Sequence, residues 1–88
     1  MADHASALKR HRQSEKRRAR NQAIKTRMRR LVREVRDAIG TRDAAAARKT
    51  LDAAARFLHK AVTKGVLHRN TAARRISRLS RAVSQLGR

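Results

Sequence analysis

A run of basic side chains near the N-terminus is the chemically most distinctive feature of this sequence. Its members are Lys9, Arg10, Arg12, Lys16, Arg17, Arg18 and Arg20. Between residues 4 and 30 the only acidic residue is Glu15, whereas a helix whose charges merely face solvent usually mixes signs to stabilise itself. Arginine supplies 19 of the 25 basic residues of the chain, and its guanidinium group binds phosphate oxygens in pairs. The run therefore predicts a nucleic-acid ligand.

Other chemistries lack the residues that they need. The chain has no Cys, and its four His residues form no pair at one-turn spacing, so we expect no metal site. The six acidic residues are scattered singly and no glycine-rich phosphate loop is present, so we expect no enzymatic activity, no cofactor and no small-molecule substrate. No apolar run approaches the roughly 18 residues that cross a bilayer, and the basic run lacks the bulky apolar face of a membrane-surface helix.

The composition predicts a small all-α protein. The chain has 88 residues, a formal net charge of +19, no Pro and one aromatic residue, Phe57. Ala, Arg, Lys and Leu dominate and favour helices, and no stretch alternates apolar and polar residues as a half-buried strand does. Gly40, Gly65 and Gly87 divide the chain into three segments and a one-residue tail. We expect one domain, residues 1–88, with a marginal fold because few large apolar residues are available for a core.

The first segment combines two unlike parts. From residue 24 onward the large apolar residues form one helical stripe. The stripe consists of Ile24, Met28, Leu31, Val32, Val35 and Ile39. Extended toward the N-terminus, the same face carries only polar or charged residues, namely Asn21, Arg17, Gln13, Arg10 and Ser6. We therefore expect a basic extension over residues 1–23, helical when it binds its ligand, and a helical bundle over residues 24–88.

The second and third segments supply the other faces of this bundle. Residues 44–62 place mostly small side chains on one face, so another helix can approach closely, with Phe57 at the edge of that face. Residues 72–86 carry a further stripe that includes Ile76 and Leu79. Short connections favour antiparallel neighbours, so we expect an antiparallel three-helix bundle. A first helix from Ala5 to Ile39 would extend about 50 Å and project beyond the bundle.

Candidate capping residues mark the ends of these helices. Thr41 or Asp43 can accept a hydrogen bond at the start of the second helix, and Asn70 is favourable at the start of the third. Gly65 suits the left-handed position after the second helix, which lets Val66 fold back onto the last turn in a Schellman-type contact.

The charge distribution assigns the basic surface to the first and third helices. Residues 1–36 carry 13 basic and 3 acidic residues, residues 37–63 carry 5 and 3, and residues 64–88 carry 7 and none. A helix-turn-helix around residue 65 is disfavoured, because the loop is long and base-reading Asn and Gln are scarce on the third helix. The near absence of aromatic residues argues against stacking on single-stranded bases. Recognition of backbone shape remains, in a folded RNA or a packaged DNA.

Two stretches resemble a known family. SALKRHRQSEKRRARNQAIKTRMR, from Ser6 to Arg29, resembles the N-terminal helix of the bacterial small-subunit ribosomal proteins numbered twenty, and AVTKGVLHRNTAARRISRL, from Ala61 to Leu79, resembles that family's second signature. The resemblance covers essentially all 88 residues, with the same three-segment plan. It implies a cytoplasmic protein that binds 16S rRNA directly in the 30S subunit, joins the 5′ domain to the 3′ minor domain during assembly, and does not form homo-oligomers.

The resemblance also implies two sets of rRNA-binding residues. The first set, on the N-terminal helix, comprises Ser6, Lys9, Arg10, Gln13, Ser14, Arg17, Arg18, Asn21 and Lys25, and we add four further basic residues of the same stretch, Arg12, Lys16, Arg20 and Arg29. The second set comprises Lys64, His68, Arg69, Asn70, Arg74, Arg75 and Arg78. The alternative function is a nucleoid or histone-like protein that compacts DNA, and a membrane-lytic peptide is a third.

Overall fold

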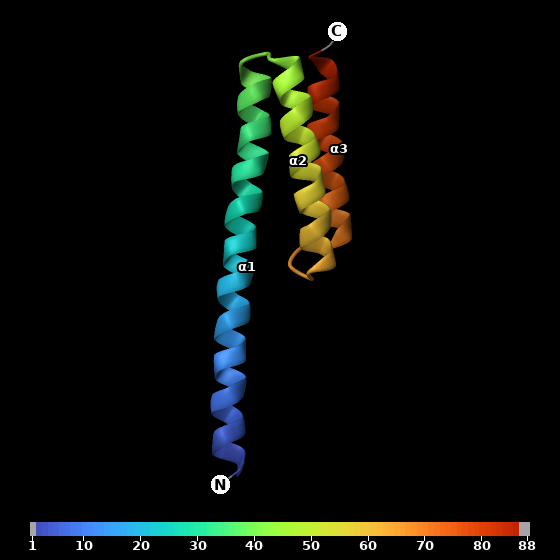
Figure 1. Ribbon diagram of the computed structural model, residues 1–88. Helices are drawn as coiled ribbons and strands as arrows, with labels where there is room; N and C mark the ends of the chain where they lie inside the picture. The colour runs from blue at the N-terminus through green and yellow to red at the C-terminus, as the bar shows by residue number, and fades with distance from the viewer. Residues whose placement is uncertain (1, 87–88) are drawn as a thin grey trace.

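Three α-helices make up the protein. The computed structural model describes residues 2–86 and contains α1 (Ala2–Gly40), α2 (Ala44–Thr63) and α3 (Arg69–Gln85), with no strand among the described residues (Figure 1). The chain runs up α1, down α2 and up α3, so α2 is antiparallel to both of its neighbours. The all-α prediction and the antiparallel three-helix arrangement are confirmed.

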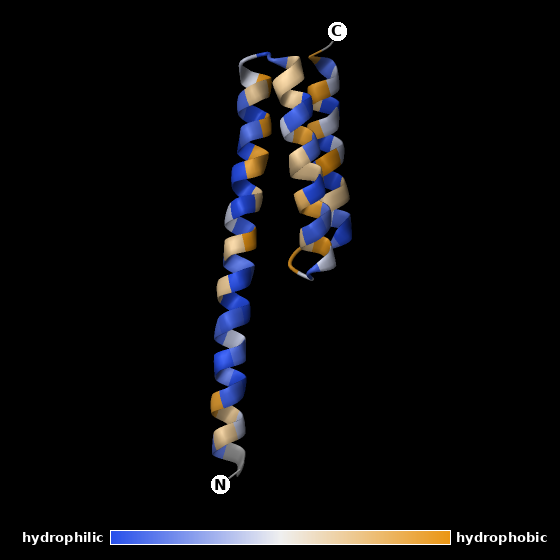
Figure 2. Cartoon of the chain, viewed as in Figure 1, coloured by the Kyte–Doolittle hydropathy of each residue, from blue (hydrophilic) through white to orange (hydrophobic). Residues whose placement is uncertain are grey.

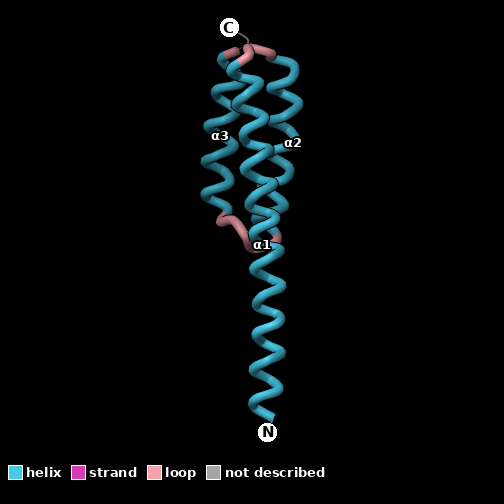
Figure 3. Tube along the Cα trace, turned by 90° about the vertical axis from the view of Figure 1, so that its left-hand side faces the viewer, coloured by secondary structure: helices cyan, strands magenta, loops and turns pink. Residues whose placement is uncertain are grey.

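The first helix is about twice as long as the other two. Its 39 residues extend about 58 Å at 1.5 Å per residue, slightly more than the sequence predicts, because the helix begins at Ala2 and ends at Gly40. The radius of gyration is 17.8 Å, against about 12 Å for a compact chain of this length. The cause is visible in Figures 1 and 3, where the N-terminal half of α1 extends alone beyond the bundle.

The hydrophobic core lies along α2, between α1 and α3. One cluster contains Val35 and Ala38 of α1, Ala47 and Ala54 of α2, and Leu79 and Val83 of α3. A second cluster, nearer the turn between α2 and α3, contains Met28, Leu58 and Ala72. The alanines on α2 leave room for both neighbouring helices to approach closely, as their spacing predicts. In Figure 2 the apolar bands of α1 lie mainly in its C-terminal half, on the side that faces α2.

The connection between α1 and α2 closes both helix ends with hydrogen bonds. The Asp43 side chain caps α2 by accepting a 3.0 Å bond from the Ala46 amide, so of the two predicted caps Asp43 is the one used. Thr41 instead donates its hydroxyl to the Ala38 carbonyl. The left-handed residue here is Arg42, with φ 58°, rather than the preceding glycine, because α1 continues through Gly40 before the chain turns.

The turn between α2 and α3 contains the predicted Schellman motif. Gly65 has φ +76°, its amide bonds to the Val62 carbonyl, and the Val66 amide bonds to the Ala61 carbonyl at 3.0 Å. The predicted cap of α3 at Asn70 is wrong. His68 is the cap, since its Nδ1 accepts a 3.1 Å bond from the Asn70 amide, and the helix therefore begins two residues earlier than a cap at Asn70 would place it.

Candidate nucleic-acid interface

The N-terminal part of α1 is not covered by the rest of the protein. Every side chain from residue 4 to residue 20, hereafter the projecting segment, is exposed, and burial begins only at Asn21, which is half-buried. Its one acidic group, Glu15, lies 3.8 Å from His11 Nε2. Among the side chains of residues 4–86 this is the only contact within 4.0 Å between a basic and an acidic group, so the seven basic side chains of the projecting segment have no carboxylate partner among these residues.

The polar face of the projecting segment continues the core face of α1. Arg10, Gln13 and Arg17 follow in helical register from the buried Met28. Next to them lies a shallow hollow that is formed by this one helix. Its lining residues are Ser14, Arg17, Arg18, Asn21, Gln22 and Lys25. The first predicted set therefore lies on a single helix, as expected. Those of its side chains that lie between residues 4 and 20 are exposed to solvent on every side of this helix.

The second predicted set is distributed between a turn and the solvent side of α3. Lys64 is exposed in the turn, and Arg69, Arg74, Arg75 and Arg78 are exposed on the helix. His68 and Asn70 are also exposed, but the hydrogen bond between them caps α3. The His68 ring thus shapes the start of the helix that presents the arginines.

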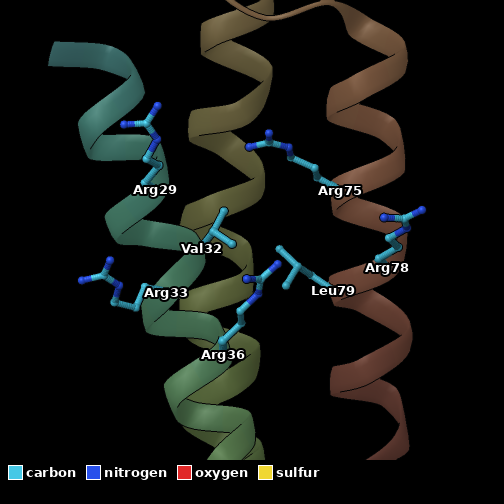
Figure 4. Close-up of a pocket in the computed structure, with 7 residues that line it drawn as sticks. All are labelled: Arg29, Val32, Arg33, Arg36, Arg75, Arg78 and Leu79. Carbon is cyan, nitrogen blue, oxygen red and sulfur yellow. The ribbon is translucent and has the colours of Figure 1, made fainter. Parts of the chain in front are cut away.

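The two predicted sets meet where α1 passes α3. A space of about 460 Å³ lies between α1 and α3, with Val32 and Leu79 at its base (Figure 4). It is lined by Arg29, Arg33 and Arg36 of α1 and by Arg75 and Arg78 of α3. We call this space the arginine groove. Arg33 and Arg36 were missed in the sequence analysis. Their spacing from Arg29 places them along one flank of α1, but the position of α3 beside that flank is not encoded in any local pattern.

A smaller pocket lies at the fork where α1 leaves the bundle. Arg20 and Lys64, one from each predicted set, line it with Ile24 and Phe57, in a volume of about 240 Å³. The Arg27 guanidinium carbon lies 5.1 Å from the centre of the Phe57 ring, a cation–π contact that holds this side chain against the half-buried aromatic ring. Phe57 thus packs at the edge of the bundle, as predicted. Arg27 and Lys60, which also line the pocket, were absent from the predicted sets.

None of the helices in residues 2–86 carries an apolar stretch of membrane-spanning length. Comparison with known proteins identifies the family. The family model of ribosomal protein S20 matches residues 2–84.

The chain belongs to the ribosomal protein S20 family.

Curated relatives in this family match over nearly the whole chain. The small ribosomal subunit protein bS20 of Nitratidesulfovibrio vulgaris strain DP4 is 51% identical over 98% of this chain and 99% of its own length. The protein of the same name from Solidesulfovibrio magneticus is 54% identical over 97% and 96%, and that of Geobacter metallireducens is 44% identical over 99% and 100%. The resemblance found in the sequence is therefore confirmed, and the S20 match includes both the projecting segment and the bundle.

Proposed function

We propose that this protein is a structural constituent of the small ribosomal subunit in the cytoplasm, and that it binds 16S rRNA directly and bridges RNA segments during assembly. Membership in a family of small-subunit proteins supports the structural role and favours ribosomal RNA over packaged DNA as the polyanion. The observation that carries direct binding is the projecting segment, a basic helix that is exposed on every side.

The projecting segment needs a counter-charge from outside the chain. Isolated helices of this length are marginal in water, and most helices in proteins are stabilised by packing that residues 4–20 lack. Seven basic side chains within 17 residues repel one another. RNA phosphates remove this repulsion and release condensed counterions as they bind. Binding and helix formation in the projecting segment therefore stabilise each other.

The length of α1 supports bridging. The projecting segment extends about 25 Å beyond the bundle, several times the Debye length of about 8 Å at physiological salt. Phosphates bound near its tip and phosphates bound by α3 therefore interact with different groups of charges. A straight cationic rod can hold RNA segments together that would otherwise repel, and the 5′ and 3′ minor domains of 16S rRNA are the proposed pair.

Hydroxyl-radical footprinting of 16S rRNA tests the two contacts. The full chain should protect two separate regions, and a version that lacks residues 1–22 should keep only the region bound by the bundle. Within residues 4–86 all ten buried apolar side chains lie at Met28 or beyond, so the shortened protein retains this core, which circular dichroism can check. An unchanged pattern of protection would contradict the bridging role. Equal affinity for 16S rRNA and duplex DNA at about 0.2–0.3 M salt, where non-specific attraction weakens, would contradict RNA specificity.

Circular dichroism also tests the coupled ordering. The free protein should have less helix than its complex with RNA, by an amount equivalent to the roughly 20 residues that precede the bundle. Full helix content in the free protein at low salt would refute the ordering step but would leave direct binding intact.

A further inference from the structure

The arginine groove is a second concentration of positive charge, separate from the projecting segment. Its two walls come from residues at least 39 positions apart in the sequence. Arg29, Arg33 and Arg36 belong to α1, and Arg75 and Arg78 belong to α3. In Figure 4, Arg36 and Arg75 reach over the space between the helices in front of α2, whereas Arg33 and Arg78 point outward at the two rims. The groove therefore presents guanidinium groups both inside and along its edges.

The charge of the groove is not neutralised within the protein. All five arginines are exposed, and none has a carboxylate within 4.0 Å in the described structure, where the one ion pair joins His11 to Glu15. The neighbouring acidic residues of α1, Glu34 and Asp37, are also exposed without an ion-pair partner. Like charges held on two helices around one hollow repel, so an anion that enters the hollow is favoured.

The base of the groove is apolar. Leu79 is buried at 6% exposure and Val32 is half-buried against the same core cluster. In Figure 4 their side chains lie between the arginines of the two helices. A ligand that suits the groove thus combines negative charge at two edges with an uncharged face in the middle. A nucleic-acid strand has this pattern, because its phosphates alternate with sugars and bases.

We propose that the arginine groove is a third RNA contact, which holds the sugar–phosphate backbone of a single RNA strand running between α1 and α3. The proposal rests on the proposed function and identifies a binding site within it. A volume of about 460 Å³ lies within the range of roughly 300–1,000 Å³ for pockets that hold small ligands, so it suits one or two nucleotides rather than a duplex. Arg36 and Arg75 bind phosphate oxygens inside the groove, and Val32 and Leu79 contact the sugar.

The position of the groove favours RNA over an acidic protein partner. The charged side chains of the groove are all arginines, whose planar fork matches the oxygens of phosphate. The groove is also continuous with the proposed rRNA surface, because Arg29, Arg75 and Arg78 belong to both. Arginine pairs with carboxylates as well, so it is this continuity, and not the residue type, that favours RNA over an acidic peptide.

The decisive experiment compares two charge-matched double variants of the full chain in binding to 16S rRNA. Arg36→Gln/Arg75→Gln removes the two inner groups, and Arg48→Gln/Lys49→Gln removes two exposed charges from α2, outside the groove. We expect the groove variant to lose affinity about ten- to a hundredfold. The slope of log K against log salt concentration is negative, and its magnitude should decrease by about 1.5–2, as expected for two lost phosphate contacts. The α2 variant should bind nearly as the native chain does.

A charge-preserving variant separates phosphate binding from simple attraction. Arg36→Lys/Arg75→Lys keeps both positive charges but loses the paired hydrogen bonds. It should keep most of the salt dependence while its affinity decreases several-fold. Circular dichroism should give the same melting temperature for all three variants, because the substituted residues are exposed.

Other outcomes would overturn the groove proposal without affecting the proposed function. If Arg36→Gln/Arg75→Gln binds RNA like the α2 control, while neutralising the projecting segment still weakens binding, the groove is not an RNA contact. If a titration shows that tripolyphosphate binds in the groove of the native chain, but Arg36→Gln/Arg75→Gln binds RNA normally, the groove binds small anions only. An acidic protein that binds the native chain and not the groove variant, with RNA binding unchanged, would identify a protein partner. If no basic variant weakens RNA binding, the proposed function itself fails.

Cross-linking can locate the strand. The chain has no Cys, so Arg33→Cys carries a photoreactive label at a unique position on the groove rim. The label should cross-link to nucleotides that differ from those protected by the projecting segment. A cross-link to the same nucleotides, or to none, would contradict a third contact.

Discussion

The two halves of α1 carry nearly equal numbers of basic residues but have different surroundings. Residues 4–20 contain seven basic residues and residues 24–40 contain six. The halves differ on one face, where Arg10, Gln13 and Arg17 in the first half correspond to Ile24, Met28 and Val35 in the second. Met28 and Val35 are buried, whereas every side chain from residue 4 to residue 20 is exposed. The face that a helix offers, rather than its net charge, determines whether it joins the bundle.

The comparison has an energetic consequence. The C-terminal half of α1 is stabilised by burial against α2 and α3, and this burial is present in the free protein. The N-terminal half buries nothing, so its helix depends on its own propensity and on a polyanion that reduces its repulsion. Substitutions on this face of α1 should therefore affect folding in the C-terminal half and binding in the N-terminal half.

The largest expected effect distinguishes two identical substitutions. Leu58→Ala removes a side chain that is 1% exposed and packs against Met28 and Ala72, and should lower the free energy of unfolding by about 2–5 kcal/mol. Leu8→Ala removes a side chain that is 48% exposed and should change it by less than about 0.5 kcal/mol. Urea unfolding followed by circular dichroism measures both. A similar loss for Leu8→Ala would mean that the projecting segment packs against the bundle.

The second effect concerns binding alone. Neutralising the face of the projecting segment with Arg10→Gln/Arg17→Gln/Arg18→Gln should weaken binding to 16S rRNA by about a hundredfold, or ~3 kcal/mol. The salt dependence of log K should decrease by about 2–3, because three phosphate contacts are lost. Filter binding at several salt concentrations measures both. The melting temperature should not fall, since none of these side chains is buried, and a large fall would contradict the division of α1 into two halves.

A smaller effect is expected at the turn that orients α3. Gly65→Ala places a Cβ on a residue with φ +76°, which should cost about 1–2 kcal/mol. No atom lies within 4 Å of that Cβ position, so the cost arises from the backbone conformation and not from crowding. Thermal unfolding should show a melting temperature lower by several degrees. An unchanged melting temperature would mean that the turn adopts another conformation at little cost.

The smallest expected effect is an increase in stability. Gly40 ends α1 with a helical backbone, and nothing lies within 4 Å of an added Cβ. Gly40→Ala should therefore stabilise the protein by about 0.5–1 kcal/mol, because alanine loses less conformational freedom in a helix. The same thermal measurement tests it. Destabilisation would indicate that the left-handed residue of this turn is at Gly40 and not at Arg42.

Features encoded by neighbouring residues were predictable from the sequence. The stripe from Ile24 to Ile39, the cap at Asp43 and the Schellman turn at Gly65 each depend on residues within a few positions of one another. The cap of α3 was not predicted correctly, because a histidine ring nitrogen took the role for which Asn70 is the more common choice. The left-handed Arg42 also departs from the preference for glycine.

The sequence by itself determined that the chain is helical, that only the C-terminal part of its first helix has an apolar face, and that its basic surface belongs to the first and third helices. These properties follow from residue type and helical period, which act over a few residues. Only the tertiary structure decided that Arg36 and Arg75 flank one groove, and that Arg20 and Lys64 line one pocket. Such pairs are 39 and 44 positions apart in the chain, and their proximity depends on how three helices pack around the small side chains of α2.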